Sequence, residues 1–176
     1  MSTQTLLRPT HSPDKSYDHV EPAAASRGDP EFQSAPFHIP NVLIIEDNPG
    51  DVELTMLAFE ARGLIADFHI AVDGSKALSY LAGLASSLHP RPDLILLDLN
   101  LPKVTGAEIL AFLKRHPYLS GIPTAILTSS NAPDDVERCS SLGVDAYLVK
   151  PMTLHGMLEM MKRIASLLER PQTPPR

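Results

Sequence analysis

Short apolar runs alternate with amphipathic stretches along the middle of the chain. Four of these runs have the length and composition of a buried β-strand, and the second along the chain predicts a weaker strand. The five runs are Val42–Ile45, Ala66–Val72, Leu94–Leu97, Thr124–Leu127 and Ala146–Val149. Residues at helical spacing fill the intervals between them. This alternation predicts βαβ units with right-handed crossovers, and therefore a parallel sheet.

Residues that favour helix starts and stops separate the predicted strands. The predicted helices start at Pro49, after Asp73, after Gly106, at Pro133 and after Thr153, and they stop at Gly63, before a longer loop over Ala82–Pro92, before Pro117, at Gly143 and near Glu169. The simplest known α/β fold for five such units in a chain of this length is a flavodoxin-like (βα)5 doubly wound sandwich. Its parallel five-stranded sheet has the order 2-1-3-4-5.

Composition places this domain between two tails. Residues 1–40 contain six of the 17 prolines and lack apolar periodicity, so we predict a disordered Pro-rich tail there, the folded domain over 41–170 and a second disordered tail over 171–176. The net charge of −6 argues against a nucleic-acid-binding surface. A single cysteine fits a reducing compartment, and no segment is long and apolar enough to cross a membrane. We therefore expect a cytoplasmic protein that binds neither nucleic acid nor membranes.

Polar residues follow four of the five predicted strands at their carboxyl ends, where ligands bind in open α/β sheets. They are Glu46 and Asp47 after the first strand, Asp98 after the third, Thr128 after the fourth and Lys150 after the fifth. Two carboxylates about 4 Å apart repel each other by roughly 4 kcal/mol at an effective dielectric constant near 20, so a cluster of three needs a cation or raised pKa values. Carboxylate ligands beside phosphate and water indicate Mg²⁺. The set predicts that Asp98 accepts a phosphoryl group.

Four motifs occur in the order found in a known family. The stretches I-I-E-D-N-P-G-D-V, L-I-L-L-D-L-N-L-P, I-L-T-S-S and Y-L-V-K-P resemble the motifs of response-regulator receiver domains of the CheY-like type, over about residues 41–170. The opening E-D-N-P-G-D-V-E-L-T, the longer loop before the third strand and L-D-L-N-L-P further resemble stand-alone receivers associated with phytochrome-type sensor kinases.

The resemblance assigns the acidic residues to one metal and phosphorylation site. It implies that Asp98 is the phosphorylated residue and a ligand of Mg²⁺, and that Asp47 is the main acidic ligand of the ion. Glu46 would belong to the same pocket, with its longer side chain reaching the metal through water. The backbone carbonyl of Asn100 would also bind the metal.

The remaining motif residues are implied to respond to the phosphoryl group. Thr128 and Lys150 would contact it, and Tyr147 occupies the aromatic switch position, which turns inward when Thr128 moves toward the phosphate. The peptide bond between Lys150 and Pro151 is implied to be cis, which costs only about 0.5–1 kcal/mol over trans for a bond to proline.

The last predicted helix is more apolar than one buried face requires, because Met160 and Leu167 widen its stripe. One interpretation is a generously buried helix. The other is a homodimer formed through the fourth helix, the fifth strand and the fifth helix, as receiver domains often use. The sequence favours neither.

Two other functions fit parts of the pattern. A phosphohydrolase that works through an aspartyl-phosphate would place a second Asp two residues after the nucleophile, where this chain has Asn100. A phosphate-independent scaffold would be a degenerate receiver, whereas Asp98, Asp47 and Lys150 are all present. We therefore expect a phosphoacceptor switch, not an enzyme, that takes its phosphoryl group from a sensor histidine kinase, of the phytochrome type by the narrower resemblance.

Overall fold

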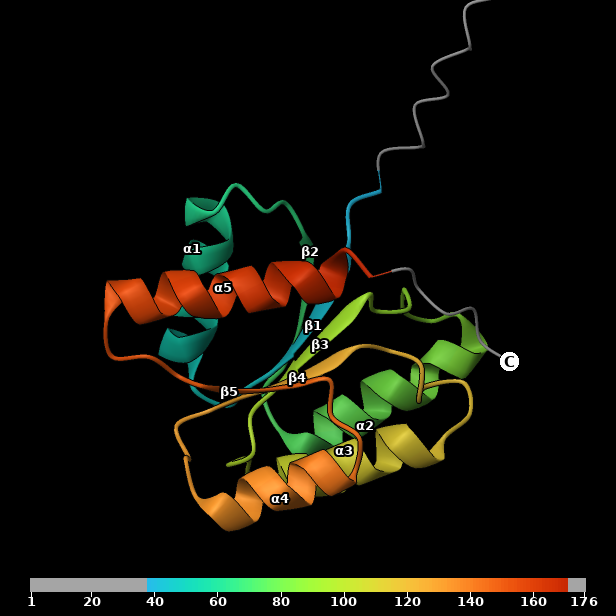
Figure 1. The fold of residues 1–176 in the computed structure, drawn as a ribbon. Helices are drawn as coiled ribbons and strands as arrows, with labels where there is room; N and C mark the ends of the chain where they lie inside the picture. The colour runs from blue at the N-terminus through green and yellow to red at the C-terminus, as the bar shows by residue number, and fades with distance from the viewer. Residues whose placement is uncertain (1–37, 171–176) are drawn as a thin grey trace, which may run out of the picture. The chain divides into compact units, whose positions relative to one another are not determined.

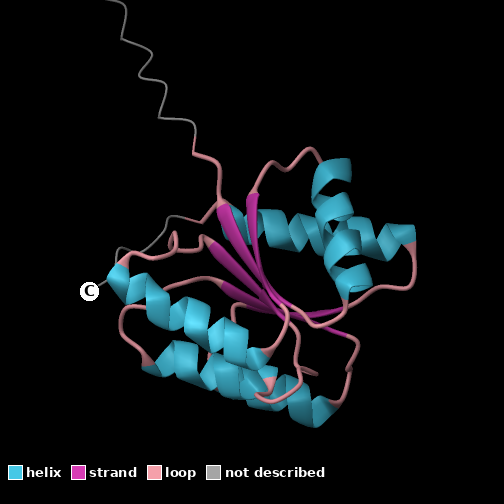
Figure 2. Ribbon diagram, turned by 180° about the vertical axis from the view of Figure 1, so that it is seen from behind, coloured by secondary structure: helices cyan, strands magenta, loops and turns pink. Residues whose placement is uncertain are grey.

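Five parallel strands form one sheet in the order β2-β1-β3-β4-β5, which confirms the predicted flavodoxin-like fold (Figures 1 and 2). The computed structural model describes residues 38–170. The strands are β1 (Asn41–Ile45), β2 (Asp67–Ala71), β3 (Leu94–Leu97), β4 (Thr124–Thr128) and β5 (Ala146–Val149). The helices are α1 (Pro49–Ala61), α2 (Gly74–Gly83), α3 (Gly106–Arg115), α4 (Pro133–Ser141) and α5 (Leu154–Leu168), with a short 3-10 helix η1 (Leu84–Ser86). Within the described residues, no helix is suited to spanning a bilayer.

Helices cover both faces of the sheet, with α1 and α5 on one face and α2, α3 and α4 on the other (Figure 1). All four residues of β3 are buried because this central strand contacts a core on each side. Leu94 and Leu96 belong to the core beneath α1 and α5, which includes Phe59 of α1. Ile95 and Leu97 belong to the core on the opposite face.

Four of the five described α-helices begin at a side chain that accepts a hydrogen bond from a free backbone N–H group. Asn48 caps α1 and Asp73 caps α2. Thr105 and Glu108 form a reciprocal capping box at α3, and Thr153 caps α5. The predicted caps at Asp73 and Thr153 are confirmed.

Part of the predicted loop after the second helix is helical. The helix α2 continues to Gly83 and is followed by η1, so the irregular connection to β3 is shorter than Ala82–Pro92. Leu84 explains the difference, because this side chain is buried in the core and keeps the chain coiled against the sheet. The two predicted tails fall almost entirely on residues 1–37 and 171–176, which lie outside the described part of the chain.

The wide apolar stripe of the last helix, α5, is buried in the structure. Met160 and Leu167 are only 6% and 2% exposed and pack in the core with Leu127 and Leu148. These two residues are therefore not available to a self-association surface, and the homodimer through α4, β5 and α5 stays a prediction. The helix α5 packs against both the sheet and α1, and therefore needs a wider apolar surface than one buried face would require. The interpretation as a generously buried helix is confirmed.

Leu167→Ala should destabilise the domain, because it leaves a cavity in this core. We expect the free energy of unfolding to fall by about 2–5 kcal/mol, measured by urea titration monitored by circular dichroism. Leu88→Ala is the control, since Leu88 is 73% exposed and a surface substitution changes stability by within about 0.5 kcal/mol. Equal stability of the two variants would contradict this assignment of Leu167 to the core.

Candidate functional site

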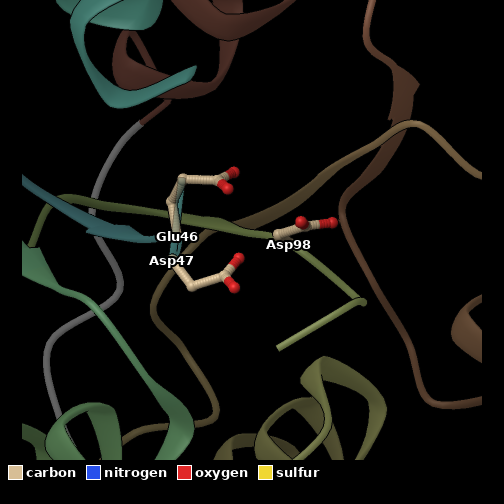
Figure 3. A group of neighbouring side chains, drawn as sticks. All are labelled: Glu46, Asp47 and Asp98. Carbon is tan, nitrogen blue, oxygen red and sulfur yellow. The ribbon is translucent and has the colours of Figure 1, made fainter. Parts of the chain in front are cut away.

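Three carboxylates meet at the carboxyl ends of β1 and β3. Glu46, Asp47 and Asp98 each offer an oxygen within 4.8 Å of the others. Figure 3 shows Glu46 and Asp47 extending from the end of β1 toward Asp98 at the end of β3. The two strands are hydrogen-bonded neighbours, and the Asp98 N–H donates to the carbonyl of Ile45 at 3.0 Å. Glu46 and Asp98 are 5% and 6% exposed, whereas Asp47 faces solvent.

The Lys150 ammonium lies among three carboxylates at the same edge. Its Nζ donates to Glu46 Oε2 at 2.7 Å and to Asp51 Oδ2 at 2.6 Å, and it lies 3.5 Å from Asp98 Oδ2. The backbone N–H of Lys150 also donates to the carbonyl of Thr128 at 2.7 Å, which fixes the start of the loop after β5. Sequence reasoning missed Asp51. Its place in the first turn of the helix after β1 was the available signal, because that turn begins at the same edge of the sheet.

Burial and charge act in different directions on this group of side chains. Burial alone would lower the pKa of Lys150, but the hydrogen bonds that its ammonium donates to Asp51 and Glu46, with the charge of Asp98, raise the pKa above 10.5. Burial raises the pKa of Glu46 above 4.5, although its hydrogen bonds from Lys150 and from the backbone of Asn48 oppose that shift. The lysine therefore stays charged, while a single ammonium shared by several carboxylates does not offset the burial of Glu46.

One oxygen of Asp98 is left without a partner. Asp98 Oδ1 is buried and accepts no hydrogen bond, whereas Oδ2 faces Lys150. A buried carboxylate oxygen without a donor is costly, and a bound cation would satisfy it. Together with the converging oxygens of Glu46 and Asp47, this unpaired atom fits a divalent metal site. The predicted role of the Asn100 carbonyl stays a prediction.

Gly106 allows the start of α3 to pack directly behind the phosphoacceptor candidate. A Cβ atom at this position would lie 2.0 Å from the carbonyl oxygen of Asp98 and 2.7 Å from the Cα of Leu99. The Gly106 N–H donates to the Leu99 carbonyl at 3.1 Å. The loop between Asp98 and α3 therefore closes tightly on itself, which sets the orientation of the Asp98 backbone.

Ser130 connects the two residues that the resemblance assigns to switching. Its N–H donates to the buried Thr128 Oγ1 at 3.2 Å, and its carbonyl accepts from the hydroxyl of the half-buried Tyr147 at 3.1 Å. Its own hydroxyl donates to Asp135 Oδ2 on α4 at 2.6 Å. Burial raises the pKa of Tyr147, so the phenol keeps its proton at neutral pH. The sequence did not predict these contacts of Ser130, because two of its partners, Asp135 and Tyr147, are 5 and 17 residues away along the chain.

The structure corrects one implied feature. The described residues contain no cis peptide bond, so the bond between Lys150 and Pro151 is trans. Trans is the lower-energy form for bonds to proline. The Lys150 amine reaches the carboxylates with the bond in this form.

The fold and this arrangement of residues define a class of protein, and comparison with known families agrees. Residues 42–162 match the family model described as the response regulator receiver domain. The chain belongs to this family and is a receiver-domain response regulator of two-component signalling systems.

The similar proteins include regulators from bacteria and archaea. Response regulator Rcp1 of Synechocystis sp. is 37% identical over 126 residues, which cover 71% of this chain and 86% of that protein. The probable methanogenesis regulatory protein FilR2 of Methanothrix harundinacea is 37% identical over 123 residues, covering 70% of this chain and 79% of that protein.

Two similar crystal structures bear on the site. The Mn²⁺-bound form of Rcp1 has a TM-score of 0.68 and 36% identity, covering 77% of this chain and 99% of that one. The phosphorylated cyanobacterial phytochrome response regulator RcpA has a TM-score of 0.69 and 33% identity, covering 79% and 100%. Both are similar to this chain over its described domain, and RcpA is named as a phytochrome response regulator.

The raised pKa of Glu46 predicts that Glu46→Gln changes the stability of the domain in a pH-dependent way. The comparison is made with a chelator present, so that no divalent metal is bound. Because the folded-state pKa lies above the unfolded value, the stability that Glu46 contributes is full below pH 4.5 and is lost as the pH rises through the raised pKa. Thermal melts should therefore show the parent losing stability relative to Glu46→Gln as the pH rises above 4.5. Glu53→Gln, at an exposed position of α1, controls for removal of one negative charge. If the parent instead became more stable relative to Glu46→Gln as the pH rises, burial would not be the largest influence on the pKa of Glu46.

Proposed function

We propose that this chain is a single-domain response regulator that accepts a phosphoryl group on Asp98 with Mg²⁺ bound beside it. The observation that carries the proposal is the surroundings of Asp98: one free buried oxygen, an ammonium at 3.5 Å and two further carboxylates within 4.8 Å. Asp47, Asp98 and Glu46, with the Asn100 carbonyl, would hold the metal. When bound, the ion would offset the negative charge that gathers at this edge during phosphoryl transfer.

The transfer needs a nucleophile and groups that stabilise charge on the moving phosphoryl. An oxygen of the Asp98 carboxylate attacks phosphorus and forms an O–P bond while the P–N bond to a donor histidine breaks, and the electron pair of that bond stays on the imidazole nitrogen. Lys150 stays protonated and provides an ammonium for the phosphoryl oxygens. Thr128 provides a hydroxyl donor, and its bond with Ser130 links that hydroxyl to Tyr147 and α4.

We propose a switch and not an enzyme acting on external substrates. A phosphohydrolase of the aspartyl-phosphate type would need a general acid two residues after Asp98, and Asn100 cannot supply a proton. The phosphate-independent scaffold is disfavoured by the intact set of Asp98, Asp47 and Lys150. The output is then a change in partner binding.

The donor is a histidine kinase that reaches Asp98 across an apolar groove between α1 and α5. Two adjoining hollows of about 280 and 400 Å³ share Leu54, Pro151, Met152 and Met157, and the smaller also includes Lys150. Leu54 and Met152 are 54% and 99% exposed. Exposed apolar side chains beside a reactive site indicate a protein partner. The likeness to RcpA, a cyanobacterial phytochrome response regulator, favours a phytochrome-type kinase.

A homodimer through α4, β5 and α5 also stays a proposal. Val136 on α4 and Val149 on the edge strand β5 are 36% and 45% exposed, which supports apolar contact with a second copy there. The contact would involve these residues and not the buried Met160 and Leu167.

Incubation with acetyl phosphate and Mg²⁺ should add one phosphoryl group, detected by intact-mass spectrometry. Asp98→Asn should abolish the adduct, and chelation should reduce it strongly, because both the nucleophile and the cation are needed. Asp67→Asn is the control, since this exposed aspartate lies at the opposite end of β2 from the site. An adduct that persists in Asp98→Asn would move the acceptor elsewhere, and turnover of phosphomonoesters would favour the hydrolase.

Leu54→Glu should separate partner binding from chemistry. We expect phosphorylation by acetyl phosphate within about twofold of the parent, because Leu54 is an exposed residue of α1 outside the carboxylate cluster. We also expect at least about a tenfold loss in transfer from an autophosphorylated phytochrome-type histidine kinase, since a charge would be buried in the contact. Leu88→Glu, at an exposed leucine outside the groove, should leave both reactions unchanged. Equal kinase transfer to Leu54→Glu and the parent would contradict this docking surface.

A further inference from the structure

Asp73 holds two elements together at the edge of the site. Its Oδ1 accepts from the Lys76 N–H at 2.8 Å and so caps α2, and its Oδ2 accepts from Lys103 Nζ at 2.8 Å. Lys103 lies in the loop between Asp98 and α3, so the ion pair joins that loop to the start of α2. The Asp73 side chain is 10% exposed, whereas that of Lys103 is 61% exposed.

The loop adopts an unusual conformation at the residue that makes the ion pair. Lys103 has φ 71°, in the left-handed region that L side chains rarely adopt. The next residue, Val104, packs against Gly74, where a Cβ would lie 2.3 Å from the Val104 carbonyl oxygen. The capping aspartate and the glycine after it therefore hold two consecutive loop residues.

We propose that the Asp73–Lys103 ion pair is a positioning device for the divalent metal. It fixes the loop that carries the backbone carbonyl of Asn100, and the inference rests on the proposed function. Asn100 lies between two anchors, the Gly106–Leu99 hydrogen bond that closes the loop behind Asp98 and the Lys103 contact with α2. A loop held in place before the metal arrives loses less conformational freedom when its carbonyl binds.

The bond to Lys103 also lowers the pKa of Asp73, as does the N–H of Lys76. The carboxylate is therefore ionised in both of its roles at neutral pH. These roles are separable, because asparagine caps helices about as well as aspartate but carries no charge for Lys103.

The experiment measures Mn²⁺ affinity of the full chain by electron paramagnetic resonance and stability by thermal melting. Asp73→Asn keeps the cap and loses the charge, and Lys103→Gly loses the ammonium but relieves the left-handed backbone. Both should weaken Mn²⁺ binding by about two- to fivefold, the range expected for a partly exposed ion pair. Lys103→Arg keeps the positive charge and should bind Mn²⁺ nearly as tightly as the parent.

Lys114→Ala is the matched control. Lys114 pairs with Asp145 at 3.1 Å near the amino ends of β4 and β5, at the opposite edge of the sheet from Asp98. This variant should lose stability without a change in Mn²⁺ affinity. Unchanged affinity in both Asp73→Asn and Lys103→Gly would overturn the positioning role alone. No binding by the parent, or equal binding by Asp98→Asn, would overturn the metal site of the proposed function and the inference with it.

Discussion

The site depends on one ammonium held among more negative charges than it can neutralise. Lys150 contacts Glu46, Asp51 and Asp98, while Asp47 lies beside them. Carboxylates at such distances repel each other by roughly 4 kcal/mol per pair at an effective dielectric constant near 20. The edge of the sheet is therefore short of positive charge. That deficit, together with the unpaired Asp98 oxygen, is what makes a divalent cation and a phosphoryl group suitable occupants.

Sheet order brings these charges together from distant parts of the sequence. Because β1 and β3 are hydrogen-bonded neighbours and run parallel, the residues that follow them end at the same edge. The strand β4 lies next to β3 and β5 next to β4, which brings Thr128 and Lys150 to that edge as well. Gly106 lets α3 begin directly behind Asp98 without a clash. The apolar core keeps the frame rigid, while the loops above it carry the chemistry.

The sequence predicted what depends on strand pattern, and it failed where contacts between distant elements decide. The run Leu94–Leu97 and the carboxylate after it were readable because a fully buried strand must be apolar throughout. Asp51 and Ser130 were not recognised, since their roles depend on how α1 and the loop after β4 face Lys150 and Tyr147. Met160 and Leu167 were ambiguous for the same reason, because an apolar stripe does not state what covers it.

Anomalous X-ray scattering from crystals grown with Mn²⁺ tests the central claim most directly. The account predicts one strong peak within coordination distance of the oxygens of Asp47 and Asp98, with Lys150 still beside Asp98. A crystal that shows no peak at these carboxylates at millimolar Mn²⁺, or a peak only at another surface site, would contradict it.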